Sequence, residues 1–169
     1  MFSPNISELL QNNAHFADSF AQGHLDVSPK RKLAVVACMD SRMDIFKMLG
    51  LRNGEAHVIR NAGGVVTDDV IRSLCLSQRA LGTEEIVLIH HTDCGLEKVT
   101  EDAFKAELEA ELGIRPWWAL ESFADPYADV RQSMRRLQLT PFVRRKEHIS
   151  GFVYSVDTGH LVEVHLDQH

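Results

Sequence analysis

Two short stretches of the sequence carry residues that could do chemistry together. The first is Cys38-x-Asp40-x-Arg42, and the second, further along the chain, is His91-x-x-Cys94. Two thiolates and one imidazole form a Cys2His set, the three-ligand pattern of a catalytic zinc whose fourth position is open. Sulfur and nitrogen donors suit zinc better than calcium or magnesium, which prefer oxygen. The sequence therefore predicts a zinc site accompanied by a carboxylate and a guanidinium.

Each stretch also has an ordinary structural explanation when it is considered by itself. Cys38 follows the apolar run LAVVA and could be a small, buried hydrophobic side chain. Asp40 and Arg42 could form a local ion pair near the start of a helix. An isolated His-x-x-Cys is weak support for a metal site, because secure assignments need four-ligand patterns. The choice between these interpretations depends on where the fold places the two stretches.

Three short apolar runs predict the strands that position these residues. Each run is continuous rather than alternating, as is typical of strands buried on both faces of a parallel sheet. The runs are Leu33–Ala37, Ala56–Ile59 and Ile86–Ile89. Between the second and the third, apolar residues recur at helical spacing up to Gly82, which predicts a helix. Strands that alternate with helices indicate an α/β fold with a parallel sheet.

The ends of these predicted strands bring the reactive residues together. In parallel α/β sheets, ligands bind just beyond the carboxyl ends of the strands. The first run leads into Cys38, the second into the loop RNAGG, and the third into HHTDCG. Neighbouring residues of an extended chain point to opposite faces. We therefore expect His91 to be the ligand that accompanies Cys94, and His90 to lie behind the sheet.

The flanking segments complete the prediction of a single domain. An amphipathic helix over Asn5–Ala21 precedes the first strand and is expected to extend to a partner subunit. Two more helical patterns cover residues 101–113 and 125–138, and GFVYSV and LVEV flank a turn around Gly159 as a hairpin. We expect one α/β domain over residues 1–169. It comprises an N-terminal helix and arm (1–32) and a core (33–169) with a mainly parallel central sheet flanked by helices and a C-terminal hairpin.

Composition and charge narrow the class of protein. The chain has 169 residues, of which 44% are hydrophobic and 25% charged, as is ordinary for a soluble globular domain. A net charge of −6 argues against a nucleic-acid partner. We expect no membrane span, because no apolar run reaches the ~20 residues that a membrane helix needs. Three cysteines, in a chain whose first residues do not resemble a secretion signal, predict the reducing cytoplasm rather than a disulfide framework.

Together, the motifs resemble the zinc signature of the β-class carbonic anhydrases. Cys38-x-Asp40-x-Arg42 and His91-x-x-Cys94 carry the likeness, and the loop RNAGG between them fits the glycine-bearing loop of the family. The resemblance extends from the first helix to the terminal hairpin, and the short chain is similar to the compact prokaryotic branch. It implies one Zn²⁺ per subunit, held by Cys38, His91 and Cys94.

The resemblance also implies how such a site works. Asp40 is a conditional fourth ligand: in a closed form its carboxylate binds the zinc, and in an open form it pairs with Arg42 and water takes its place. Asp40 then orients a zinc-bound hydroxide, which attacks carbon dioxide and gives bicarbonate and a proton. Backbone amides of Gly63, Gly64 and Gly95 could line the pocket near the metal, although glycine also serves tight turns without any other role.

Two further expectations come from the same resemblance. Members of the family are dimeric at minimum, so the protein is expected to form a homodimer or a higher homo-oligomer. The proton must leave the site, and His57, His90 or a buffer molecule are the candidates to carry it.

Other functions fit parts of the sequence. A hydrolase of carbon disulfide or carbonyl sulfide would use the same scaffold and ligands, and differs in access to the pocket. A non-catalytic, zinc-binding regulatory protein would not need Asp40 and Arg42 beside the ligands. A Rossmann-like nucleotide binder is disfavoured because no G-x-G-x-x-G or G-x-x-x-x-G-K-[ST] follows a strand. We therefore expect an enzyme, a zinc lyase that hydrates carbon dioxide reversibly.

Overall fold

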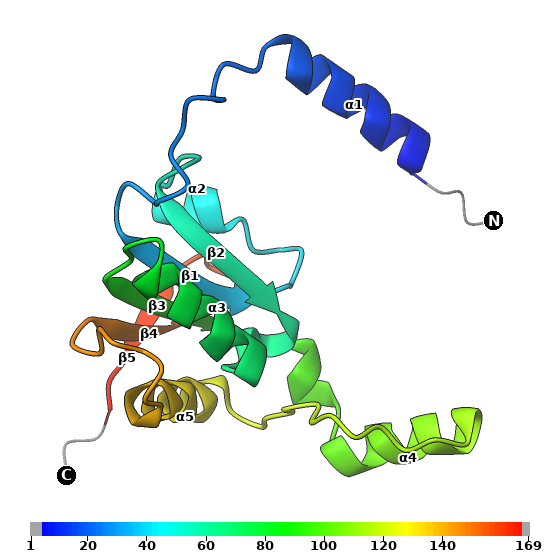
Figure 1. Ribbon diagram of the computed structural model, residues 1–169. Helices are drawn as coiled ribbons and strands as arrows, with labels where there is room; N and C mark the ends of the chain where they lie inside the picture. The colour runs from blue at the N-terminus through cyan, green and yellow to red at the C-terminus, as the bar shows by residue number, and fades with distance from the viewer. Residues whose placement is uncertain (1–4, 167–169) are drawn as a thin grey trace.

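Four parallel strands and one antiparallel edge strand form the central sheet of the computed structural model, which describes residues 5–166 (Figure 1). The strand order is β2-β1-β3-β4-β5, and only the β4–β5 pair is antiparallel. The strands are β1 (Leu33–Cys38), β2 (Ala56–Asn61), β3 (Glu85–His91), β4 (Ile149–Tyr154) and β5 (Leu161–Val164). The expected α/β fold, with its mainly parallel sheet and its C-terminal hairpin, is confirmed.

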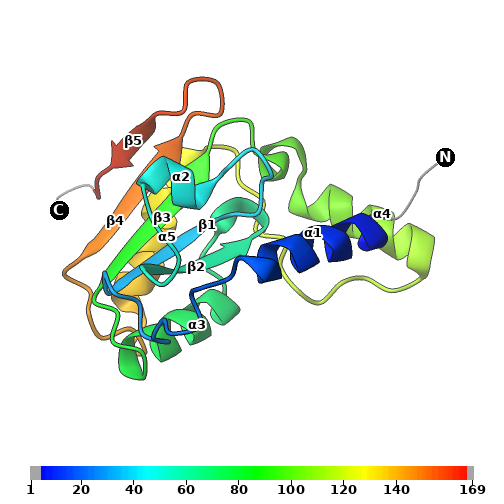
Figure 2. The ribbon, with the colours of Figure 1, turned by 90° about the horizontal axis from the view of Figure 1, so that it is seen from above.

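Helices cover both faces of this sheet. On one face, α3 (Asp68–Arg79) and α5 (Pro126–Leu139) bury apolar side chains against alternate residues of the strands. On the other face, the short helix α2 (Ile45–Leu49) closes a second apolar cluster. Figure 2 shows α2 in front of the sheet and α5 behind it. Burial on both faces explains why the strand segments are continuous apolar runs in the sequence.

The helix boundaries follow from capping residues. Thr67 and Thr100 accept hydrogen bonds from backbone amides at the starts of α3 and α4 (Glu101–Leu112). Gly113 ends α4 in the left-handed conformation, as its place after the apolar pattern predicts. The helix after β2 ends at Arg79 rather than Gly82, and α1 (Ile6–Asp18) ends three residues before the predicted Ala21. The predicted ranges included the turns that follow these helices.

Three short elements were not predicted from periodicity, because each has five residues or fewer. They are α2, η1 (Ala62–Gly64) and η2 (Gly95–Lys98). The turn η1 begins directly after β2 and packs against the ends of β1 and β3. Gly64 has φ +71°, and a Cβ there would lie 2.8 Å from the Cys38 backbone nitrogen and 3.0 Å from the Ile89 carbonyl oxygen. Close packing at this point therefore requires glycine.

Two helices project away from the sheet. Figures 1 and 2 show α1 and α4 extending to the same side of the molecule, clear of the central layers. Neither helix contains a buried residue. Within residues 5–166, no helix combines the length and apolar character needed to cross a membrane.

Replacing Gly64 by alanine is expected to destabilise the fold by roughly 2–5 kcal/mol. The left-handed backbone costs an L-residue about 1–2 kcal/mol, and overpacking adds about 1–3 kcal/mol. Gly95→Ala is the matched control, since a Cβ at Gly95 meets nothing within 4 Å, and it is expected to change stability by less than about 0.5 kcal/mol. Chemical denaturation measures both. Equal stabilities for the two variants would contradict the packing described at Gly64.

Candidate metal centre

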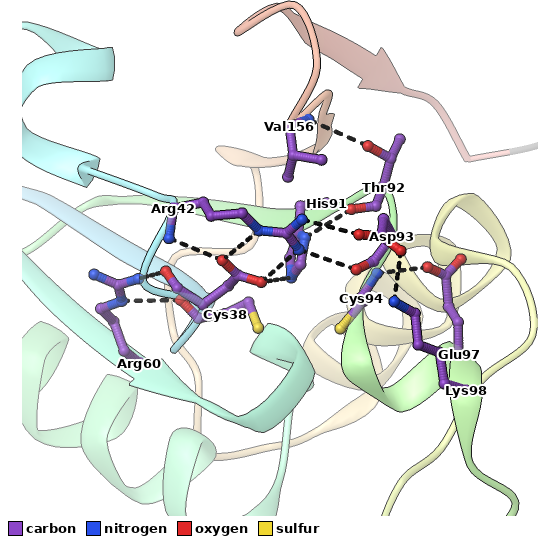
Figure 3. Close-up of polar contacts among 11 residues, drawn as sticks. Cys38, Arg42, Arg60, His91, Thr92, Asp93, Cys94, Glu97, Lys98 and Val156 are labelled. Carbon is purple, nitrogen blue, oxygen red and sulfur yellow. Dashed lines mark hydrogen bonds and ion pairs between the residues drawn. The ribbon is translucent and has the colours of Figure 1, made fainter.

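Cys38, His91 and Cys94 meet at the carboxyl-end edge of the sheet. One potential ligand atom from each residue lies within 4.8 Å of the others, and all three residues are buried. Cys38 is the last residue of β1 and His91 the last of β3, while Cys94 follows on the turn after β3. In Figure 3 the two sulfur atoms and the imidazole are turned toward a common space. The sequence prediction that these residues converge is thereby confirmed as geometry.

The imidazole of His91 is oriented for ligation. Its Nδ1 lies 2.9 Å from the carbonyl oxygen of Thr92, which can only accept, so Nδ1 carries the proton. The lone pair is then on Nε2, which is buried and has no hydrogen-bond partner within the described part of the chain. A buried nitrogen without a hydrogen-bond partner destabilises the fold unless a cation binds its lone pair. A hydrogen bond that fixes the other ring nitrogen is the usual support of a metal-binding histidine.

A hydrogen bond between the two thiols moves their pKa values in opposite directions. The pKa of Cys38 lies far below its ordinary value, chiefly because the Cys94 side chain hydrogen-bonds to it, and burial opposes this shift. The pKa of Cys94 is raised by the same shared hydrogen bond and by burial. Burial alone would lower the pKa of His91, but the charge of Cys38 raises it. A divalent cation could displace the proton between the two thiols and bind both sulfur atoms as thiolates. The affinity of the site for such a cation would therefore rise with pH.

Asp40 lies between this cluster and Arg42. Its Oδ2 is 3.7 Å from His91 Nε2, while Arg42 donates from Nε to Oδ1 (3.0 Å) and from Nη2 to Oδ2 (2.8 Å). Those hydrogen bonds hold the pKa of Asp40 well below its usual range, so the carboxyl is ionised at neutral pH. The carboxylate is thus beside the ligand cluster and bound to Arg42 at the same time.

The chain matches the sequence profile of the carbonic anhydrase family over residues 33–161. It is 55% identical over 157 residues to β-carbonic anhydrase 1 of Mycobacterium tuberculosis, an alignment that covers 93% of this chain and 96% of the relative. The chain belongs to the β-carbonic anhydrase family. Enzymes of this family are zinc enzymes, and the donor set of the cluster fits zinc.

Solved structures and a second kind of relative agree with this membership. The crystal structure of the Streptococcus mutans carbonic anhydrase superposes with a TM-score of 0.90 at 40% identity, covering 98% of this chain and 100% of that one. A carbon disulfide hydrolase of Acidithiobacillus thiooxidans is 35% identical, over 84% of this chain and 81% of the relative. Similarity to both enzymes shows that the β-carbonic anhydrase scaffold is shared by proteins named for different substrates.

A second arginine holds the backbone of the first motif. Arg60, on β2, donates from Nε to the carbonyl oxygen of Cys38 (2.9 Å) and from Nη2 to that of Asp40 (2.6 Å). The guanidinium therefore fixes the turn that carries a candidate ligand and the carboxylate. Glu97 does the same for the second motif, since its carboxylate accepts from the Cys94 backbone N–H at 2.7 Å. Both contacts are visible in Figure 3.

The histidines considered for proton release are otherwise engaged. His90 is fully buried, and its Nε2 lies 2.6 Å from the Asp129 carboxylate of α5, as expected for a residue behind the sheet. His57 Nδ1 contacts the Ser77 hydroxyl at 2.8 Å and its Nε2 the Val27 carbonyl oxygen at 3.3 Å. Full burial of His90 removes a direct exchange of its protons with bulk water.

Sequence reasoning missed two residues that complete the polar network. Asp93 and Lys98 follow Arg42 in a chain of ion pairs, with Arg42 Nη1 at 2.9 Å and Lys98 Nζ at 2.7 Å from the Asp93 carboxylate. Asp93 stands inside HHTDCG, between two candidate ligands, at a position that the spacing of the ligands does not include. An acidic residue in that position, with a lysine a few residues on, was the available signal.

Proposed function

We propose that this protein catalyses the reversible hydration of carbon dioxide to bicarbonate and a proton. The observation that carries the proposal is the buried Cys38–His91–Cys94 cluster with an ionised Asp40 beside it, in a chain 55% identical to a protein named β-carbonic anhydrase 1. Cys38, His91 and Cys94 are proposed to hold one zinc ion per subunit. Zinc, when bound there, would act as a Lewis acid that lowers the pKa of a water molecule toward ~7.

The proposed roles of Asp40 and Arg42 follow from their contacts. Arg42 holds the Asp40 carboxylate by two side-chain hydrogen bonds, and this arrangement corresponds to the proposed open position. In that position, Asp40 can accept a hydrogen bond from the attacking water and so orient it toward the carbon atom. Released from Arg42, the same carboxylate is free to be the fourth ligand, which is the closed position. Asp40 and Arg42 are thus proposed to regulate access and to orient the nucleophile.

The pocket beside this centre is proposed to include Gly63, Gly64 and Gly95. The positive φ values and close packing of Gly63 and Gly64 already require glycine for backbone reasons. Their contribution to the pocket is therefore confined to backbone groups. Gly95 adjoins Cys94 at the start of η2, where a Cβ would meet nothing within 4 Å.

Stopped-flow measurement of carbon dioxide hydration by the zinc-loaded protein, from pH ~6.5 to ~9, tests the function around the ~7 expected of an activated water. Zinc-dependent turnover that rises with pH is expected. Because the folded-state pKa of Asp40 is lowered, this carboxyl stays ionised throughout the range, so the rise does not report its titration.

Asp40→Ala is expected to lower turnover roughly a hundredfold while zinc stays bound. Full activity of that variant would refute the role of Asp40, and zinc-loaded protein inactive at every pH would refute the function.

A second candidate is hydrolysis of carbon disulfide or carbonyl sulfide. Its support is the 35% identity to a carbon disulfide hydrolase, which is weaker than the 55% identity to the mycobacterial relative. The same ligand set would serve a similar linear substrate. Comparing turnover of the three gases by one zinc-loaded preparation decides between the candidates, and preference for a sulfur substrate would overturn the proposal.

Replacing Cys94 by serine is expected to abolish zinc binding, because a serine hydroxyl remains protonated at neutral pH and cannot replace a thiolate ligand. Cys75→Ser is the matched control. Cys75 is only half-buried and lies outside the cluster, so this variant should retain its zinc. Zinc content per chain after dialysis is the measurement. A full complement of zinc in Cys94→Ser would contradict the ligand set.

The assembly is proposed to be a homodimer or a higher homo-oligomer in the cytoplasm. Supporting this, α1 and the two residues that follow it, 19–20, leave large apolar side chains exposed in the single chain. They are Ile6, Leu9, Leu10, Phe16 and Phe20. A partner subunit that covered this face would remove it from water. Sedimentation equilibrium should therefore give at least twice the mass of one chain, and a monomer at micromolar concentration would contradict the assembly.

The three free cysteines suit a reducing compartment, and cell fractionation tests the location.

A further inference from the structure

Arg42 is shared between two carboxylates, only one of which belongs to its own motif. Beyond its contacts with Asp40, the guanidinium donates from Nη1 to Asp93 Oδ2 (2.9 Å) and from Nη2 to the Asp93 carbonyl oxygen (3.0 Å). Figure 3 shows Arg42 reaching across to Asp93 on the loop after β3. The loop that follows His91 and carries Cys94 is thereby tied to the turn that follows Cys38.

The backbone of Asp93 makes the double contact possible. Its φ is +56°, in the left-handed region, which among L-residues asparagine and aspartate tolerate best. In this conformation the carboxylate and the carbonyl oxygen of one residue both accept from Arg42. The other carboxylate oxygen, Oδ1, lies 2.7 Å from Lys98 Nζ. Asp93 is thus held by a second cation while it holds Arg42.

We propose that Asp93 is a positioning residue that orients Arg42 to take the Asp40 carboxylate, and thereby favours the open position of Asp40. The inference rests on the proposed function of Asp40 and Arg42. It adds a residue to that device which does not touch the candidate ligand atoms itself. It also connects the two halves of the site through a single guanidinium.

Asp93 has two opposing effects on how Arg42 binds Asp40, and solvent exposure decides which effect is larger. Its charge competes with Asp40 for the guanidinium, whereas its contacts restrain the long Arg42 side chain in one orientation. The side chains of Arg42 and Asp93 are 45% and 52% exposed, so water and salt screen the competition. Lys98 offsets the charge of Asp93 further. Arg42 binds the two carboxylates through different nitrogens, Nη1 for Asp93 and Nε with Nη2 for Asp40, so the restraint costs no contact with Asp40 and we expect it to dominate.

Azide binding to the cobalt-substituted protein tests the proposal without any measurement of activity. Azide and the Asp40 carboxylate compete for the same position, so the apparent Kd for azide rises as the open fraction falls. Asp93→Gly removes the carboxylate without straining a left-handed backbone. It is expected to lower the open-to-closed ratio about fivefold, the factor that corresponds to one ordinary hydrogen bond, and so to raise the apparent Kd, read from the visible spectrum, by up to that factor.

Matched variants separate the positioning role from other effects. Asp93→Asn keeps an acceptor for Arg42 and tolerates the same backbone, so its Kd should stay within about twofold of the parent. Lys98→Ala removes only the outer ion pair, and the same limit applies. In an Asp40→Ala background, Asp93→Gly should have no effect, because no carboxylate remains to be positioned. Asp93→Ser replaces the glycine variant if the latter does not retain cobalt.

A rise in Kd that disappears in the Asp40→Ala background supports the proposal. An unchanged Kd, a lower Kd, or a rise that persists without Asp40 overturns it. The outcome is distinguishable from failure of the proposed function. Azide titration reports the position of Asp40 whether or not carbon dioxide is a substrate, and a protein that hydrates carbon dioxide can still show no effect of Asp93.

Discussion

The parallel pairing of β1 with β3 is the constraint on which the rest of the site depends. Ala37 lies opposite Ile89 in this register, so the two strands leave the sheet at the same edge and deliver Cys38 and His91 to one place. A shift by one residue would turn every side chain of a strand to the other face. It would exchange His91 for His90, which is bound to Asp129 on the side of α5. The two apolar layers, by burying alternate residues of both strands, hold the register.

The sequence was sufficient to predict the sheet, its long helices and the convergence of the ligand cluster. Those features depend on apolar periodicity and on the rule that parallel strands place their carboxyl ends together, and both are visible in a single sequence. The helices at Ile45–Leu49 and Gly95–Lys98 were missed, because a periodic pattern cannot develop in so few residues. For Ile45–Leu49, Asp44 and Gly50 were usable as capping signals.

The polar connections of the site were less accessible to prediction. Arg60 was recognised as part of a loop motif. Its hydrogen bonds to the carbonyl oxygens of Cys38 and Asp40 depend on the register between β1 and β2, which the sequence does not show. The contacts of Asp93 depend on one left-handed backbone angle, which composition does not determine. Side-chain hydrogen bonds between separate loops require the three-dimensional positions of both. Sequence spacing therefore predicts which residues could be ligands better than it predicts what orients them.

The contact of Arg60 with the Asp40 carbonyl oxygen affects how fast the Asp40 side chain can move as well as where it lies. Because the backbone at Asp40 is fixed from that side, movement of its carboxylate between partners requires rotation about side-chain bonds and no displacement of a loop. Rotations of exposed side chains take on the order of picoseconds to nanoseconds, and the hydrogen bonds from Arg42 slow that of Asp40, whereas lids and loops that close over active sites move in microseconds to milliseconds. In the proposed mechanism, Asp40 would therefore exchange between its partners without waiting for a loop to move. Its effect on the reaction would be that of an equilibrium population, with no slow step of its own.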